Sequence, residues 1–235
     1  MVKIPRAEKV FDDIYLIGGS NLSGAGDCLV YLIKTSDGLI MIDSGVDKNS
    51  VDYFIENIKS LNFNPNDLKY LILTHCHIDH IGGAYRLQNE FKVKVIAHEI
   101  EAPVIEGKEH PERTGASFYG VDYTPCTIDI KLKGELNEIR FGNKKINFLH
   151  TPGHTPGGIS PYIDLEGKRI LFGQDVHGPL LKGFGSNLKD YLNSLNKLLK
   201  LDADILCEGH FGIFQPKEEV FRYIKKYIMI YSKRK

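Results

Sequence analysis

The sequence lacks an excess of charge of either sign. Its 235 residues contain 30 Lys and Arg side chains and 30 Asp and Glu side chains, so the formal net charge at pH 7 is zero. A protein that binds nucleic acid or an anionic membrane surface usually carries a basic excess, at least over one domain. The balance therefore predicts neither a nucleic-acid partner nor a membrane partner.

Long hydrophobic runs and paired cysteines are also missing. Segment 1–6 has no apolar run of the length that a signal peptide needs, and no segment approaches the roughly 20 apolar residues that cross a bilayer. The four cysteines form no CxxC pair, and we interpret them as small buried hydrophobes in a reducing compartment. These absences predict a cytoplasmic protein.

The chain shows no internal repeat, no low-complexity tract and no linker rich in Pro, Gly or Ser. Its length suits one α/β domain with a sizeable core. The hydrophobic content of 42% and the charged content of 26% are those of an ordinary globular protein. We predict a single domain over residues 1–235.

Strand and helix signals alternate in both halves of the chain. Alternating or continuous apolar runs predict strands over 10–17, 28–34, 39–42, 70–73, 93–97, 136–141, 145–149, 160–164, 170–172 and 203–206. Apolar residues at helical spacing predict helices over 51–61, 84–90, 188–199 and from near Pro216 onward. Two strand-rich halves, each closed by helices, predict two sheets packed face to face with helices outside.

The pattern is interrupted from about residue 99 to residue 132. This segment contains three prolines together with Phe118, Tyr119 and Tyr123. Loops of this length inside compact domains are usually functional or disordered, and the aromatic content argues against disorder. We predict an irregular insertion that serves as a lid or as the contact of a homodimer. The alternative is a helical insertion that merely packs on the body.

The most informative segment is His75-x-His77-x-Asp79-His80, which follows a predicted strand. Zinc is bound by imidazole nitrogen and carboxylate oxygen, and a catalytic site keeps one position for water. Alternate residues of an extended segment point the same way, so His75 and His77 can share an ion. Asp79 and His80 come where the chain turns and can reach a second ion. The segment therefore predicts a metal site.

Three later residues occupy similar positions. His154 lies in a tight turn after the strand at 145–149, and Asp175 and His210 each follow a short strand beside glycine. Loops at one rim of a sheet can converge on one site. We therefore expect these three side chains to complete the metal site.

The order HxHxDH, then GHTPGG around His154, then Asp175 and finally His210 resembles the metallo-β-lactamase superfamily. The turn Asp43-Ser44-Gly45 resembles the Asp-Thr/Ser-Gly element of that superfamily. The resemblance covers nearly the whole chain. It implies an αββα sandwich, an α/β fold in which two mixed sheets are flanked by helices.

The resemblance also implies a pair of metal ions with seven ligands. The implied ligands of the first ion are His75, His77 and His154. Those of the second ion are Asp79, His80 and His210, and Asp175 bridges the two ions. It further implies that Asp43 orients the ligands, a role that metal sites generally need. The ligand types suit two divalent ions, zinc first, with iron and manganese as alternatives.

The implied chemistry is hydrolysis. Two divalent ions about 3.5–4 Å apart can share a water and lower its pKa toward neutrality. The resulting bridging hydroxide attacks a carbonyl or phosphoryl centre, while a metal takes up the oxyanion charge. Asp175, as the bridge, and Asp79, which orients the hydroxide or shuttles its proton, are the predicted catalytic residues.

Within the superfamily, GHTPGG and Asp175 resemble the glyoxalase II-like hydrolases. Glyoxalase II proper carries a long helical C-terminal extension that binds glutathione, whereas only 211–235 follows His210 here. Quorum-signal lactonases place a tyrosine soon after the bridging Asp, where this chain has His177. We predict a small-molecule substrate that is an ester, a thioester or a lactone.

Several alternatives stay open. Persulfide dioxygenases of this superfamily bind one iron through two histidines and an aspartate and keep the same residues. Phosphodiesterase and β-lactamase activities are further alternatives, and a binding protein with a vestigial site would hold no metal.

A second group of polar and aromatic residues is predicted to line the substrate pocket: His177, His110, Arg113, Phe118 and Tyr119. His98 and His150 end predicted strands and are interpreted as structural.

Overall fold

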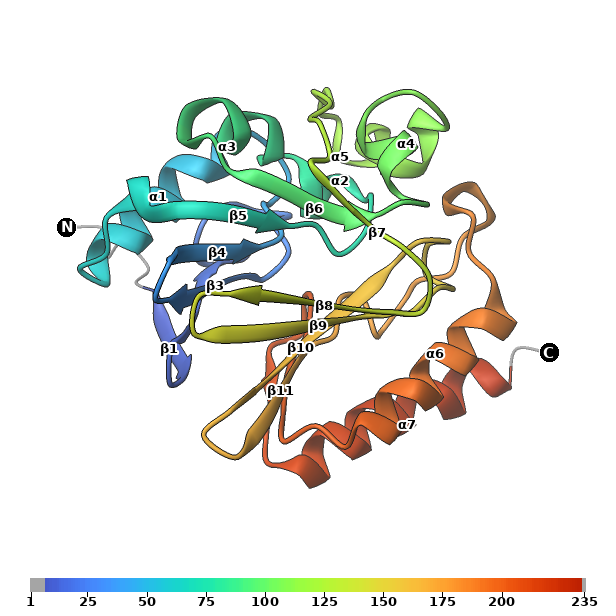
Figure 1. Cartoon of the computed structure of the whole chain (residues 1–235). Helices are drawn as coiled ribbons and strands as arrows, with labels where there is room; N and C mark the ends of the chain where they lie inside the picture. Colours follow the sequence, from blue (N-terminus) through green and yellow to red (C-terminus); the bar gives the residue numbers. More distant parts are fainter. Residues whose placement is uncertain (1–6, 234–235) are drawn as a thin grey trace. The chain divides into compact units, whose positions relative to one another are not determined.

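The computed structural model describes residues 7–233 (Figure 1). The chain divides into two compact units, Met1–Leu132 and Lys133–Lys235, and the single domain over 1–235 stays a prediction beside this division. Segment 1–6, on which the signal-peptide prediction falls, lies outside the described residues. Within residues 7–233, no helical segment combines the length and the apolar character that crossing a bilayer requires.

The first unit contains a mixed sheet of seven strands in the order β1-β2-β3-β4-β5-β6-β7. Neighbours are antiparallel from β1 to β4 and parallel from β4 to β7. The strands are β1 (Glu8–Phe11), β2 (Ile14–Gly18), β3 (Val30–Thr35), β4 (Gly38–Ile42), β5 (Leu68–Ile72), β6 (Lys94–His98) and β7 (Ile130–Leu132). Parallel neighbours require crossover connections, and these connections carry the helices.

The helices of this unit are α1 (Ser50–Ser60), α2 (Ile78–Ile81), α3 (Ala84–Phe91), α4 (Ala102–Ile105) and α5 (Ala116–Tyr119), with single 3₁₀ turns η1 (Pro65–Asp67) and η2 (Pro111–Thr114). Helix α1 buries Val51, Phe54 and Ile58, which lie at helical spacing, as its sequence predicted. These side chains share one core cluster with Leu87 of α3 and with strand residues such as Leu71. Figure 1 shows α1 and α3 beside this sheet.

The single strand predicted over 10–17 is wrong. The segment forms a hairpin of β1 and β2, in which Phe11 pairs with Ile14 and Asp12 has a positive φ of 41°. Aspartate tolerates this left-handed conformation better than most residues, so the chain can form a tight turn inside the segment that the apolar alternation marks as one strand.

The segment 99–132 is folded and packs into the first unit. Ala102 and Ile105 of α4 are fully buried, and Cys126 and Ile128 join the same core cluster. Its last three residues form β7, which pairs with β6, so the irregular stretch ends earlier than predicted. Much of the segment therefore fits the alternative of packing on the body, while its lid and homodimer roles stay predictions.

The second unit contains a mixed sheet of six strands in the order β13-β12-β11-β10-β9-β8. Only β11 and β12 are parallel. The strands are β8 (Leu136–Phe141), β9 (Lys144–His150), β10 (Ile159–Leu165), β11 (Lys168–Phe172), β12 (Ile205–Cys207) and β13 (Ile213–Phe214), of which β13 was missed by the sequence patterns. The 3₁₀ turn η3 (Lys182–Phe184) precedes two long helices, α6 (Leu188–Leu201) and α7 (Lys217–Ser232).

Helices α6 and α7 pack on this second sheet. Their buried side chains form one cluster with Leu171 of β11 and Leu206 of β12. The apolar spacing of the last helix predicts an inward face made of Val220, Phe221, Ile224, Tyr227 and Ile228. Val220 and Ile224 are buried as predicted, but the prediction is wrong for Phe221, which is 55% exposed. Each helical residue is turned by about 100° from the previous one, so Phe221 cannot share the buried direction of Val220.

Candidate metal centre

Four of the predicted donors lie where β5 runs into α2. His75, His77, Asp79 and His80 are between 0% and 6% exposed. Nε2 of His75 is 3.0 Å from Nδ1 of His77, as expected for alternate residues of an extended segment. Nε2 of His80 is 3.6 Å from Oδ2 of Asp79, in the single turn of α2. The first unit thus brings together three imidazoles and one carboxylate.

Asp43 fixes one of these imidazoles. It follows β4 with a φ of 62°, and Oδ2 of its carboxylate is 2.8 Å from Nδ1 of His80. A carboxylate only accepts hydrogen bonds, so Nδ1 of His80 carries the proton and Nε2 keeps its lone pair for a metal. The backbone N–H and the hydroxyl of Thr74 donate to the same carboxylate at 2.8 Å. This arrangement gives Asp43 the orienting role that metal ligands usually require.

Gly82 and Gly83 let the ligand segment approach the turn that contains Asp43. A Cβ on Gly82 would lie 2.0 Å from the carbonyl oxygen of Val46, and one on Gly83 would lie 2.5 Å from that of Ser44. The backbone N–H of Ser44 and its hydroxyl both donate to the carbonyl of His80. These glycines therefore permit close backbone packing.

Two buried cysteines lie beside the donors of the first unit. Sγ of Cys28 lies within 4.8 Å of a carboxylate oxygen of Asp43 and a ring nitrogen of His80. Burial raises the pKa of the Cys28 thiol to about 12, which favours the neutral thiol. Burial also raises the pKa of Cys76, whose thiol donates to the carbonyl of Arg113. Both cysteines fit the interpretation as small buried hydrophobes.

The remaining three donors lie at strand ends of the second unit. His154 follows β9, Asp175 follows β11, and His210 follows β12. One oxygen of Asp175 is 3.3 Å from Nε2 of His154, and its other oxygen is 3.3 Å from Nε2 of His210. The carboxylate of Asp175 thus lies between two imidazoles.

Local contacts hold these donors in place. The carbonyl of Pro179 accepts a hydrogen bond at 2.9 Å from Nδ1 of His154, which leaves Nε2 of His154 facing Asp175. Gly209 is required beside Asp175, because a Cβ there would lie 2.6 Å from Oδ1 of that carboxylate. Gly153 is required next to α6, where a Cβ would lie 2.2 Å from the backbone of Tyr191.

The sequence patterns missed Glu208, which is fully buried next to these donors. Its Oε1 is 2.8 Å from Nδ1 of His177, and its Oε2 accepts from the backbone N–H groups of His210 and Phe211. An acidic residue that directly follows the apolar strand β12 was the available signal. His177 lies mostly buried against Glu208 and His210, and its place in a substrate pocket stays a prediction.

The other predicted pocket residues lie in the segment 99–132. His110 is exposed, and its ring nitrogen lies 3.2 Å from the carboxylate of Glu112. The carbonyl of Arg113 reaches Cys76, between two donors. Phe118 is 74% exposed, and the ring of Tyr119 lies over Gly26. The contact of Arg113 with Cys76 therefore joins this segment to the ligand segment.

Both donor sets suit a divalent metal. Imidazole nitrogen and carboxylate oxygen are the ligands that zinc, iron and manganese accept, and each set is buried except for the partly exposed His210. Burying several charged or polar groups within 3.0–3.6 Å of one another is costly without a compensating charge. A bound cation would provide that compensation.

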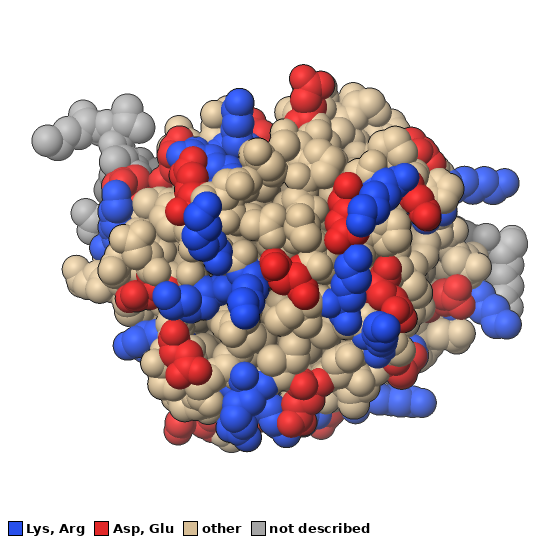
Figure 2. All heavy atoms as spheres, turned by 45° about the horizontal axis from the view of Figure 1, so that its top comes forward, with Lys and Arg blue, Asp and Glu red and all other residues tan. Residues whose placement is uncertain are grey.

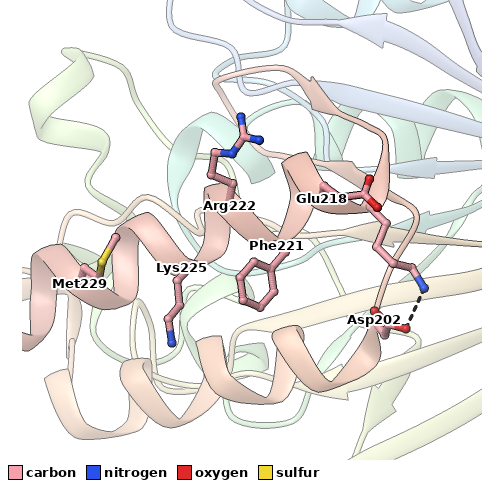
Figure 3. A pocket seen from close by; sticks show the side chains of 7 residues that line it. Asp202, Glu218, Phe221, Arg222, Lys225 and Met229 are labelled. Carbon is pink, nitrogen blue, oxygen red and sulfur yellow. Dashed lines mark hydrogen bonds and ion pairs between the residues drawn. The ribbon is translucent and has the colours of Figure 1, made fainter.

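The second unit also has a surface hollow of about 520 Å³. It is lined by Asp202 and by residues of α7, and Figure 3 shows Phe221 and Lys225 pointing to the same side of that helix. None of the lining residues is a predicted ligand.

On the face drawn in Figure 2, Lys and Arg are interleaved with Asp and Glu and form no extended area of one sign.

Solved structures with a similar fold are metallo-beta-lactamases. One from Cronobacter sakazakii is 21% identical, with 97% of each chain covered and a TM-score of 0.81. Another from Elizabethkingia meningoseptica is 25% identical, covers 99% of this chain and 94% of that one, and has a TM-score of 0.80. The predicted fold class, two mixed sheets flanked by helices, is confirmed.

Sequence relatives point the same way. A probable metallo-hydrolase of Bacillus subtilis is 25% identical over 206 residues, which are 84% of this chain and 87% of the relative. A hydroxyacylglutathione hydrolase (glyoxalase II) of Brucella ovis is 32% identical over 149 residues, which are 61% of this chain and 48% of the relative. The sequence model of the metallo-beta-lactamase superfamily matches residues 23–210, and the chain belongs to that superfamily.

Proposed function

We propose that this metal-dependent hydrolase binds two divalent ions, zinc in the first place, and cleaves a small ester, thioester or lactone. The proposed ligands come from both units: His75, His77, Asp79, His80, His154, Asp175 and His210. Membership of the superfamily and the order of these residues along the chain support the proposal.

The observation that carries the proposal is the environment of Asp175. Each oxygen of its carboxylate faces the Nε2 atom of a different imidazole, at 3.3 Å in both cases. A carboxylate in this position would be suited to bind two cations, with His154 and His210 as further donors.

The protein groups have separable roles in this proposal. Two divalent ions, when bound, supply an activated water at neutral pH and stabilise negative charge on the reacting carbonyl. Asp79 would orient that water or shuttle its proton. Asp43 and the carbonyl of Pro179 hold His80 and His154 in the tautomer that directs Nε2 toward a metal.

The aromatic residues of the segment 99–132 support a substrate with an apolar portion. The ring of Tyr119 lies over Gly26. Cys28, two residues after Gly26, donates its backbone N–H to the carbonyl of Asp79. The exposed ring of Phe118 is adjacent in sequence. Phe118 and Tyr119 are therefore the proposed contacts of an apolar portion of the substrate, and the same exposed rings support a homodimer through this segment.

Elemental analysis of the purified protein, run beside a panel of thioesters, lactones, phosphodiesters and a chromogenic β-lactam, tests the proposal. We expect two divalent ions per chain and hydrolysis of a thioester, an ester or a lactone. His75→Ala and His154→Ala, one in each unit, should each lower the metal content, whereas the exposed His110→Asn should keep it at two. One iron per chain with oxygen consumption on a persulfide would overturn the hydrolase proposal.

A further inference from the structure

His210 is the least enclosed of the predicted ligands in the second unit. Its side chain is 23% exposed, whereas that of His154 is 3% exposed. It lies in the loop after β12, between Gly209 and Gly212, and Gly212 has a φ of 110°. Glycines give a backbone more freedom than other residues do, so this loop needs contacts from outside to hold His210 in one orientation.

Glu208 supplies the first of these contacts. Its carboxylate is fully buried, and Oε2 accepts hydrogen bonds from the backbone N–H groups of His210 at 2.7 Å and of Phe211 at 2.8 Å. Hydrogen bonds to a charged group in a buried position are stronger than those between neutral groups. The backbone of His210 is therefore anchored by a side chain only two residues before it.

The other oxygen of Glu208 reaches the loop that carries Asp175. Oε1 is 2.8 Å from Nδ1 of His177, two residues after Asp175. The ring of His177 packs edge to face against the ring of His210, with centroids 5.2 Å apart, and against Phe211, with centroids 4.7 Å apart. One carboxylate thus joins the loop of the predicted bridging ligand to the loop of its neighbouring ligand.

We propose that Glu208 is a positioning residue for the metal centre, which acts by locking His210 against Asp175 through His177. This inference rests on the proposed function, since His210 and Asp175 are ligands only in that proposal. Partners that orient metal ligands typically contribute about 10- to 100-fold to metal affinity. A mobile His210 binds its ion more weakly because the loop must be ordered on binding.

Three variants separate the contacts of Glu208. Glu208→Ala removes its hydrogen bonds with His177, His210 and Phe211. Glu208→Gln keeps a carbonyl oxygen that can still accept from the backbone N–H groups of His210 and Phe211, but it loses the charge. His177→Phe keeps an aromatic ring against His210 and loses the bond to Glu208. The matched control is Glu138→Gln, at an exposed carboxylate that pairs with Lys145.

Zinc affinity is measured by competition with a chelator, and thermal unfolding of the metal-free protein is measured in parallel. We expect Glu208→Ala to weaken binding of one zinc ion about 10- to 100-fold. Glu208→Gln should recover part of this loss, and Glu138→Gln should bind as the wild type does. In the metal-free protein, hydrogen exchange of the His210 and Phe211 amides should accelerate in Glu208→Ala and stay slower in Glu208→Gln.

The outcomes distinguish the two proposals. A wild-type protein that binds no second ion overturns the proposed function and this inference with it. A wild type that binds two ions, beside a Glu208→Ala variant with unchanged affinity, overturns the positioning role alone. A loss of affinity in Glu208→Ala without faster exchange of the His210 amide also overturns it, because the loop would then be ordered without Glu208.

Discussion

Oδ2 of Asp43 lies 2.8 Å from Nδ1 of His80, and both side chains are buried. Asp43 belongs to the turn after β4, whereas His80 belongs to α2, 37 residues further along the chain. The backbone of Ser44 donates to the carbonyl of the same histidine. The side chain and the main chain of one turn therefore define both the tautomer and the position of His80.

The first prediction concerns this pair. Asp43→Asn replaces a charged acceptor by a neutral amide, which weakens the preference of His80 for the tautomer with a proton on Nδ1. We expect about 10- to 100-fold weaker zinc binding, measured by chelator competition. Asp37→Asn, at an exposed turn, is the matched control. Equal zinc affinity in Asp43→Asn and the wild type would contradict the orienting role.

The second prediction concerns Gly82. A Cβ at this position would lie 2.0 Å from the carbonyl oxygen of Val46, so Gly82→Ala forces two backbone segments apart. We expect the free energy of unfolding to fall by about 1–3 kcal/mol or more, measured by urea denaturation. Gly183→Ala is the control, because no atom lies within 4 Å of a Cβ there and its φ is not positive. Similar stability of the two variants would be evidence against the close packing.

The third prediction concerns the support of the Asp175 loop by α6. The hydroxyl of Tyr191 donates to the carbonyl of Val176, and burial raises the pKa of this phenol above its ordinary value. Tyr191→Phe leaves the buried carbonyl without this donor, which should cost about 1–3 kcal/mol of unfolding free energy. The half-exposed Tyr53→Phe should change stability by less than about 0.5 kcal/mol. A Tyr191→Phe protein as stable as Tyr53→Phe would show that the hydroxyl contributes nothing to the native state.

The fourth prediction concerns pH. Both oxygens of Asp164 accept hydrogen bonds from Arg169, at 2.7 and 2.9 Å, and this guanidinium lowers the pKa of Asp164 below its ordinary value of 3.8. A lowered pKa means that the native state favours the carboxylate. The pair therefore contributes its full stability above pH 3.8, and this is lost as the pH falls through the lowered pKa.

Asp164→Asn should lower the free energy of unfolding by up to about 1 kcal/mol at pH 7, because the pair is partly exposed and screened by solvent. The difference from the wild type should vanish at a pH below the lowered pKa of Asp164. Unfolding curves at several pH values measure it. A difference that stays constant over the whole pH range would point to packing rather than charge.

Local patterns predicted much of the secondary structure because they report which side of an element is buried. The strand over 136–141 matches β8, and the helix predicted over 188–199 matches most of α6. Patterns failed where a local conformation broke a continuous signal, as at Asp12 between β1 and β2. They also failed for Phe221, where apolar character alone does not identify the buried side of a helix.

The amino-acid sequence by itself determined the kinds of donor and their places at the ends of strands, because ligand chemistry and strand periodicity are local properties. Only the tertiary structure decided which group orients each donor: Asp43 for His80, the carbonyl of Pro179 for His154, and Glu208 for the backbone of His210. The first two partners lie 37 and 25 residues from the imidazoles they hold. Periodicity carries no information on distances between such separated segments, which are set by the packing of side chains and by the close approaches that glycines permit.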